Sequence, residues 1–330
     1  RSTDSEAYPS RQGGLSGVPL ETHRPASRYL PWTPRKGDFN LAYNAKTDDR
    51  EEVHMPPAAN LKNMIRSGPM VVAPGAHDCL TAQLVEQAGF PAVYMTGAGT
   101  SVAHGLPDYG LLTMTEMVAN AGRMAGTVGV PLISDADTGY GNELNVYRTV
   151  QSFERAGVAG IHIEDQVFPK RCGHLDGKEL ITLDDYAAKI RAAAAARRTG
   201  DFLIIARTDA RGVAGFDEAV RRCNAALEAG ADMAFFEAPQ TAEEVAEVPR
   251  AVKGPCLFNL VVSGKTPAIP LPEIERMGYR LAIVPGMLMS SIIGLCDRLL
   301  AELKSTGLAP APYSAGGPGA TFARVGAADW

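Results

Sequence analysis

The sequence predicts an α/β fold, a (β/α)8 barrel of the TIM type, and three observations support this prediction. Short apolar segments recur eight times between residues 70 and 286, and each is flanked by Gly, Pro or Asp. Longer amphipathic segments lie between them, and this alternation is typical of a parallel sheet covered by helices. The chain has 330 residues, 45% of them hydrophobic, which is enough for one large core.

The predicted strands are nearly continuous in apolar residues, as parallel strands buried on both faces are. In chain order they cover residues 70–76, 92–97, 131–137, 160–165, 202–209, 233–238, 256–261 and 281–286. The clearest helices are expected at residues 79–89, 113–129, 183–198 and 216–230. A doubly wound sheet is the alternative, but no GxGxxG motif follows the first strand, which disfavours it.

Three regions are predicted along the chain. Residues 58–310 form the barrel, residues 1–57 an extended or disordered arm, and residues 311–330 a tail. The arm shows no sustained hydrophobic period, and its first part is rich in Arg, Ser, Pro and Gly with few acids. A transit peptide has a similar composition, but we expect a plain arm and a cytoplasmic protein.

Composition excludes several classes of function. The net charge is −5 and no basic stripe is present, so we expect no nucleic-acid partner. No apolar run approaches the roughly 20 residues that a membrane span needs. The five cysteines form no CxxC pair, which indicates free thiols in a reducing compartment. Four of them lie in apolar patterns and are expected to be packing residues: Cys79, Cys223, Cys256 and Cys296.

Acidic residues stand at or after the ends of several predicted strands, where the loops of such a barrel form its active site. The relevant acids are Asp108, Asp135, Asp137 and Glu164. Carboxylates gathered there would repel one another unless a cation compensates, and their hard oxygens suit Mg²⁺ or Mn²⁺ better than zinc. The alternative is that each acid caps a helix or pairs with an arginine.

Two further strand ends suggest a site for a carboxylate ligand. Gly97 and Gly99 would permit close approach of the backbone, whose free N–H groups would bind a carboxylate. The alternative is an ordinary tight loop. Arg207 could clamp a carboxylate in bidentate fashion, or could pair with Glu237 or Asp209.

A long loop is predicted after the fourth strand, from about residue 166 to residue 180, and loops of this length are usually functional. It contains Cys172 with three neighbouring cations: Lys170, Arg171 and His174. We expect these cations to favour the thiolate, so that Cys172 can give and regain a proton near neutral pH. Gly173 and Gly177 would let the loop hinge over the site.

Five motifs together resemble the isocitrate lyase/phosphoenolpyruvate mutase superfamily. They are GLPD (105–108), DADTGYG (135–141), IEDQ (163–166), PKRCGH (169–174) and ARTDA (206–210). The similarity covers about residues 60–305 and is strongest to the branch with 2-methylisocitrate lyase and 2,3-dimethylmalate lyase. The resemblance implies an α/β barrel in a homotetramer, whose last helix, residues 287–305, is swapped between neighbours.

The resemblance also implies roles for matching positions. Asp135 would contact Mg²⁺ directly, and Asp108, Asp137 and Glu164 would hold its water ligands. Cys172 would be the general acid, acting with Arg207 and His174, while Tyr140 or a metal-bound water would be the hydroxyl base. The implied substrate-binding residues are Thr96, Gly97, Ala98, Gly173, His174, Arg207, Glu237 and Asn259.

We therefore expect a Mg²⁺-dependent carbon–carbon lyase. By retro-aldol cleavage it would convert a 2-hydroxy di- or tricarboxylate to pyruvate or glyoxylate plus a second carboxylic acid. Val262 stands where relatives carry an acid, and CGHLDGK replaces the CGHRPNK of methylisocitrate lyases, so the substrate stays open. The alternatives are an oxaloacetate hydrolase or decarboxylase, a phosphonate-processing mutase, and an inactive barrel that serves as an assembly subunit.

Overall fold

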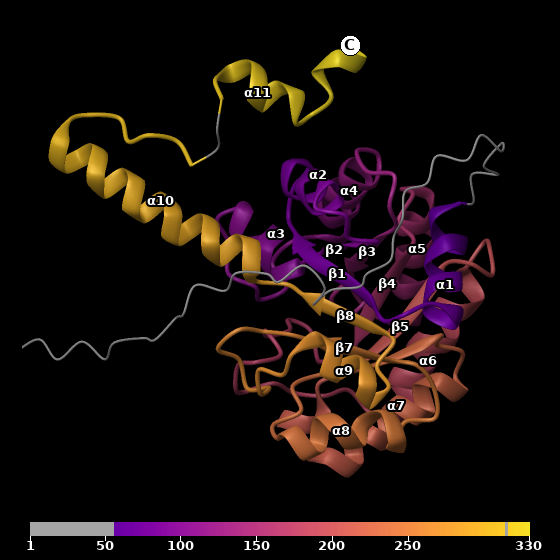
Figure 1. Cartoon of the computed structure of the whole chain (residues 1–330). Helices are drawn as coiled ribbons and strands as arrows, with labels where there is room; N and C mark the ends of the chain where they lie inside the picture. The colour runs from indigo at the N-terminus through magenta and orange to yellow at the C-terminus, as the bar shows by residue number, and fades with distance from the viewer. Residues whose placement is uncertain (1–55, 314–315) are drawn as a thin grey trace, which may run out of the picture. The chain divides into compact units, whose positions relative to one another are not determined.

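The structure is a computed structural model that describes residues 56–313 and 316–330. Most of the predicted N-terminal arm lies outside the described residues. Eight parallel strands form a closed barrel in the order β1-β2-β3-β4-β5-β6-β7-β8, and helices surround them (Figure 1). The strands are β1 (Val71–Ala76), β2 (Val93–Met95), β3 (Leu132–Asp135), β4 (Gly160–Glu164), β5 (Leu203–Thr208), β6 (Met233–Phe236), β7 (Cys256–Asn259) and β8 (Leu281–Val284).

Helices precede and connect these strands. They are α1 (Pro57–Ser67), α2 (Cys79–Gln87), α3 (Gly97–Ala103), α4 (Met114–Ala125), α5 (Glu143–Arg155), α6 (Leu183–Ala196), α7 (Phe216–Glu228), α8 (Ala242–Ala251) and α9 (Leu271–Met277). Several begin with a side-chain cap: Asp78 accepts a hydrogen bond from the Thr81 N–H, and Thr113 from the Glu116 N–H. Such caps satisfy the free N–H groups of a helix's first turn.

The barrel interior is filled by side chains from alternate strand positions. Ile133, Leu203 and Phe235 pack there with Leu61 and Ile65 of α1. The helix α1 therefore contributes to the apolar core inside the barrel. Parallel strands place their carboxyl ends at one end of a barrel, so the loops that follow them converge there.

All eight predicted strands are confirmed, but most end sooner than predicted. The residues after several strands turn away from the sheet: Asp137 and Ala238, for example, have positive φ angles of 46° and 54°. Residues Gly97–Gly99 do not form the tight loop that was the alternative for them, because α3 begins at Gly97 with Thr96 as its N-cap. Propensity alone disfavours a helix that starts with Gly-Ala-Gly.

The helix expected at residues 287–305 is α10 (Met287–Thr306), which follows β8 in the chain. It contains no buried residue. Beyond it lie α11 (Pro318–Ala323) and the 3-10 helix η2 (Ala327–Asp329). Among the described residues, no helix is long and apolar enough to cross a membrane.

Three of the four cysteines expected to pack do so. Cys223 and Cys256 are buried in the core, and Cys79 packs against it. The prediction for Cys296 is wrong within this chain, because that residue is exposed on α10. Its apolar neighbours in the sequence belong to a helix that has no fully buried residue and touches the barrel core only near its start, at Leu288.

The closure of the barrel beside β8 depends on a glycine. A Cβ atom at Gly75 would lie 2.6 Å from Cα of Pro285, in the segment after β8. We expect Gly75→Ala to lower the free energy of unfolding by about 1–3 kcal/mol, because backbone must move to admit the methyl group. Denaturant unfolding followed by circular dichroism measures this change.

The matched control is Gly200→Ala, since a Cβ atom there meets nothing within 4 Å. It should change stability by less than about 0.5 kcal/mol. Equal effects of the two substitutions would contradict the role of Gly75.

Candidate active site

A cavity of about 590 Å³ opens at the carboxyl ends of the strands. Most of the residues singled out in the sequence line it: Thr96, Ala98, Asp108, Asp135, Cys172, Gly173, His174, Arg207, Glu237 and Asn259. They come from strands and loops spread around the whole barrel. Closure of the barrel therefore brings together residues that are more than 150 positions apart in the sequence.

Three predicted residues lie behind this lining. Gly97 supports it from below: a Cβ atom there would lie 2.8 Å from Cγ of Asp135, so the glycine lets that carboxylate rest against α3. Asp137 is buried, with Oδ1 2.9 Å from Nζ of Lys170. Glu164 is fully buried, with Oε2 3.3 Å from Nε of Arg207.

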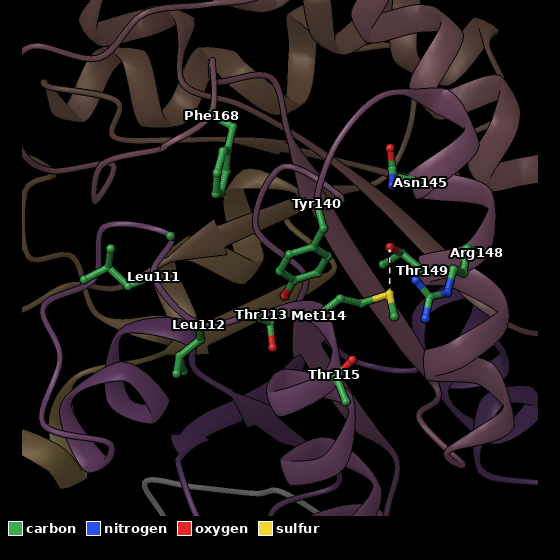
Figure 2. A pocket seen from close by; sticks show the side chains of 11 residues that line it. Leu111, Leu112, Thr113, Met114, Thr115, Tyr140, Asn145, Arg148, Thr149 and Phe168 are labelled. Atoms are coloured by element: carbon green, nitrogen blue, oxygen red, sulfur yellow. Dashed lines mark hydrogen bonds between the residues drawn. The ribbon is translucent and has the colours of Figure 1, made fainter.

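Tyr140 lies elsewhere, in a second cavity of about 330 Å³ formed by the loops after β2, β3 and β4. Figure 2 shows its ring among the lining side chains, between Phe168 and Thr113. Its hydroxyl is buried and has no hydrogen-bond partner among the described residues. Tyr140 does not line the first cavity, so its role as the hydroxyl base stays a prediction.

The charge of the acid cluster is balanced largely by Lys170. Its ammonium contacts Asp108 and Asp137, and it is almost completely buried. Burial would lower the pKa of Lys170, but Asp137, Glu164 and Asp108 raise that pKa well above its usual value. The interpretation of Lys170 as a cation that acts on the Cys172 thiol is therefore wrong, because its ammonium is committed to carboxylates.

Asp135 remains ionised at the centre of the site. Burial alone would raise its pKa, but His162, Lys170 and Arg207 outweigh this effect and lower the pKa to about 2. Its Oδ1 accepts a hydrogen bond of 2.9 Å from the Asp137 N–H. By contrast, burial raises the pKa of Asp137 to about 6, against the opposing effect of Lys170.

These donors fit a magnesium ion that is held mainly through water. No group of three or more His, Cys, Asp or Glu side chains within the described residues converges to bind a metal directly. Mg²⁺ usually retains several waters and takes one or two protein carboxylates. Asp135 supplies an ionised carboxylate. Glu164 forms an ion pair with Arg207, but neither of its buried oxygens has a hydrogen-bond partner among the described residues, so both can accept bonds from coordinated water.

Tyr94 and His162 are site residues that the sequence analysis did not identify. Tyr94 lines the cavity, and its Oη lies 2.8 Å from Nε2 of the fully buried His162. Burial lowers the pKa of His162 to about 4, so the imidazole is neutral. The available signal was a polar side chain at an inward-facing position of an otherwise apolar strand.

Arg207 is held by Asp209 from beneath the cavity. Its Nε and Nη2 donate to the two carboxylate oxygens of Asp209 at 2.9 and 3.2 Å. Glu237 lies 3.7 Å away, and the guanidinium stands over the Phe235 ring. The proposed pairing of Arg207 with Asp209 and Glu237 is therefore observed, while the side chain still faces the cavity.

A deeper layer fixes Asp209 in turn. The Asp209 N–H donates to Asp165 at 2.9 Å, and Asp165 also accepts bonds from Thr208 and from Arg222 on α7. Polar groups this deeply buried are stable only when they are hydrogen-bonded. The network sets the position of the guanidinium before any ligand arrives.

The loop between β4 and α6 covers the cavity with Cys172. Burial raises the pKa of the Cys172 thiol, although a backbone hydrogen bond from His174 opposes the effect. The predicted thiolate is therefore wrong at neutral pH, and the side chain is a thiol. Burial also lowers the pKa of His174, so this residue adds no positive charge.

Polar contacts hold this loop in place. Nδ1 of His174 accepts a hydrogen bond from the Lys265 N–H at 3.0 Å, and its Nε2 lies 3.3 Å from Glu237. Lys178 donates to the carbonyl groups of Gly173 and Leu175. The loop is therefore held by the segment after β7 and by hydrogen bonds among its own residues.

Comparison with known proteins places this arrangement in a family. The family described as phosphoenolpyruvate phosphomutase matches residues 61–304. The chain belongs to the phosphoenolpyruvate mutase/isocitrate lyase superfamily. The resemblance stated from the sequence motifs is thereby confirmed.

Individual members of the superfamily are similar over most of their length. A 2,3-dimethylmalate lyase of Eubacterium barkeri is 50% identical over 229 residues, 69% of this chain and 79% of the relative. A 2-methylisocitrate lyase of Aeropyrum pernix is 45% identical over 251 residues, 76% of this chain and 81% of the relative. A crystal structure of 2,3-dimethylmalate lyase matches with a TM-score of 0.80 and 40% identity, covering 83% of this chain and 93% of that one.

These findings confirm the barrel fold and the carbon–carbon lyase class that were expected from the sequence. The roles of individual residues stay predictions. The two cavities described above differ in chemistry. The cavity at the carboxyl ends of the strands contains the ionised Asp135, Arg207 and a thiol, and the cavity around Tyr140 contains mainly apolar and hydroxyl groups.

The protonated state of Cys172 can be tested directly. Since burial raises its pKa, the rate of iodoacetamide alkylation at Cys172 should rise with pH to a midpoint above the ordinary thiol value. Peptide mass spectrometry measures the rate at that site, and Cys172→Ser identifies the peptide. A midpoint below pH 8 would show instead that the loop stabilises a thiolate.

Proposed function

We propose that the protein is a Mg²⁺-dependent lyase that cleaves the C2–C3 bond of 2-hydroxy di- or tricarboxylates. The observation that carries the proposal is the convergence on one cavity of an ionised carboxylate at Asp135, a guanidinium at Arg207 and a thiol at Cys172. These groups supply a cation site, a carboxylate partner and a proton donor. The similarity to 2,3-dimethylmalate lyase and 2-methylisocitrate lyase supports the same reaction class.

The substrate would be bound through the two carboxylates that flank the C2–C3 bond. Thr96, Gly97 and Ala98 would bind the carboxylate of the forming keto acid, Gly97 and Ala98 through their backbone N–H groups, since the Thr96 N–H donates to the Ala76 carbonyl. Arg207 would bind the other reacting carboxylate, since its guanidinium is oriented in advance by Asp209. Further polar contacts would come from Gly173, His174, Glu237 and Asn259.

Asp135 would bind Mg²⁺ directly, while Asp108, Asp137 and Glu164 would hold its waters; Mn²⁺ could substitute. The ion, when bound, would act as a Lewis acid toward the 2-oxygen of the substrate. The hydrogen bond from the Asp137 N–H orients the Asp135 carboxylate for this task. The ammonium of Lys170 would neutralise part of the negative charge of the neighbouring acids.

The proposed cleavage is a retro-aldol reaction. A base removes the proton of the C2 hydroxyl, the C2–C3 bond breaks, and its electron pair passes to C3 and the adjoining carboxylate as an aci-carboxylate. Cys172 donates its Sγ proton to C3, and the thiolate regains a proton from solvent. A raised thiol pKa suits this role, because the acid must hold its proton at neutral pH. The products are pyruvate or glyoxylate and a second carboxylic acid.

The deciding experiment is a substrate panel. We expect the purified protein with Mg²⁺ to release pyruvate from 2,3-dimethylmalate or 2-methylisocitrate, measured in a lactate dehydrogenase-coupled assay, and EDTA to abolish the release. Cys172→Ser should lower kcat by about 10²–10⁴-fold, the usual contribution of a general acid. Cys296→Ser, on the exposed helix α10, is the matched control and should retain activity.

Other results would favour the alternatives. Acid or CO2 release from oxaloacetate alone would indicate a hydrolase or decarboxylase. Conversion of a phosphonate would indicate a mutase, and no turnover of the whole panel with metal present would indicate an inactive barrel. Full activity of Cys172→Ser would refute the assigned proton donor.

We also propose a homotetramer with α10 swapped between subunits, in the cytoplasm. The support for the swap is that α10 has no buried residue and exposes Ile292, Ile293, Leu300 and Leu303. The support for a reducing compartment is that all five cysteines are free. Light scattering should give four times the mass of the chain, and Leu300→Asp should reduce it. A monomeric mass for the native protein would overturn the assembly.

A further inference from the structure

The cavity of the proposed active site has two unlike sides. Asp135 stands at the end of β3 and Glu164 at the end of β4. In the closed order of the barrel, β7 and β8 lie across from these strands. The segments that follow β7 and β8 line the cavity mainly with the apolar side chains of Val261, Val262, Met287 and Met289, together with the hydroxyl groups of Ser263, Ser290 and Ser291. The acidic side and this apolar wall therefore face each other across the cavity.

The cavity has no cation to spare for a third carboxylate. Among the described residues that line it, Arg207 is the single lysine or arginine, and it is already bonded to Asp209. His174 is neutral, because burial lowers its pKa and its Nδ1 accepts a hydrogen bond from the backbone. A carboxylate placed against Val261 and Val262 would therefore meet no cation. The donors that the segments after β7 and β8 place in the cavity lining are the uncharged hydroxyl groups of Ser263, Ser290 and Ser291, which bind a carboxylate less strongly than a cation does.

The wall also has room for more than a methyl group. The cavity holds about 590 Å³, within the range of pockets that enclose drug-sized ligands. Val262 is 71% exposed although it lines the cavity, so its side chain has apolar surface that a ligand can cover. Covering such surface with a hydrocarbon group is favourable in proportion to the area removed from water.

We infer that the substrate carries a hydrocarbon substituent on C3, the carbon that becomes the carbanion, and that this substituent lies against the wall formed by Val261, Val262, Met287 and Met289. The inference rests on the proposed lyase function and narrows its substrate class. The preferred substrates are 3-alkyl-2-hydroxydicarboxylates, including alkyl groups larger than methyl, and tricarboxylates are disfavoured. Val262 is then a specificity-determining residue.

An isosteric pair of substrates tests this inference. In 3-isobutyl-2-methylmalate an isopropyl group replaces the third carboxylate of 2-methylisocitrate, and both compounds release pyruvate on cleavage. We expect kcat/KM to be at least about 10-fold higher for the isobutyl compound, the discrimination that an apolar pocket commonly provides. An equal or higher kcat/KM for 2-methylisocitrate overturns the inference.

Val262→Arg should reverse the preference, because it adds a cation to the wall. It should lower kcat/KM for the isobutyl compound by about 10-fold and raise that for 2-methylisocitrate. Val213→Arg is the matched control: Val213 is an exposed valine that lines neither cavity, and the substitution should leave the ratio unchanged. If the ratio of kcat/KM for the two substrates is unchanged in Val262→Arg, Val262 does not take part in substrate recognition.

Binding measurements separate this inference from the proposed function. Isobutylsuccinate and tricarballylate mimic the two substrates but lack the hydroxyl group that cleavage needs. Calorimetry on the Mg²⁺-loaded protein should show tighter binding of isobutylsuccinate, by about 10-fold, and Val262→Arg should abolish the difference. If no 2-hydroxy acid is cleaved yet this preference is found, the lyase function fails and the apolar subsite stands; tighter binding of tricarballylate overturns the subsite.

Discussion

The site depends on the balance between buried carboxylates and two buried cations. Asp135, Asp137 and Glu164 are almost completely removed from solvent at the mouth of the barrel, as are Lys170 and Arg207. An unpaired buried charge costs several kcal/mol, so each acid requires a partner close by. Lys170 forms ion pairs with Asp108 and Asp137. Arg207 forms ion pairs with Glu164, Asp209 and Glu237. Asp135 keeps its charge because it lies near both cations and accepts a hydrogen bond from the Asp137 N–H.

This balance joins the loop after β4 to the barrel. Lys170 belongs to the same loop as Cys172, so the ammonium that neutralises the acids and the thiol that faces the cavity lie on one segment. Lys178 and His174 add contacts to the loop carbonyls and to the segment after β7. The position of the Cys172 thiol is therefore linked to the ion pairs of the acids beneath it.

Much of the fold followed from local patterns in the sequence. Apolar runs marked all eight strands, because strands buried on both faces have no polar side to alternate with. Acids and an arginine at strand ends marked residues that line the cavity or lie directly behind its lining, since parallel strands bring their carboxyl ends to one place. The helix α3 was missed because Gly97 and Gly99 argue against a helix, while the N-cap at Thr96 and burial of this turn favour it. Tyr94 and His162 were missed because each appeared as one more residue of an apolar strand.

The sequence by itself determined the barrel, the superfamily and which residue types gather at the strand ends. The tertiary structure decided how those groups share charge. Cations next to Cys172 in the chain predicted a thiolate, yet Lys170 points to the acids and burial raises the pKa of the thiol. The apolar wall that faces the acids likewise exists only because closure of the barrel sets β7 and β8 opposite β3 and β4. Protonation and specificity depend on distances and burial, which neighbours along the chain do not fix.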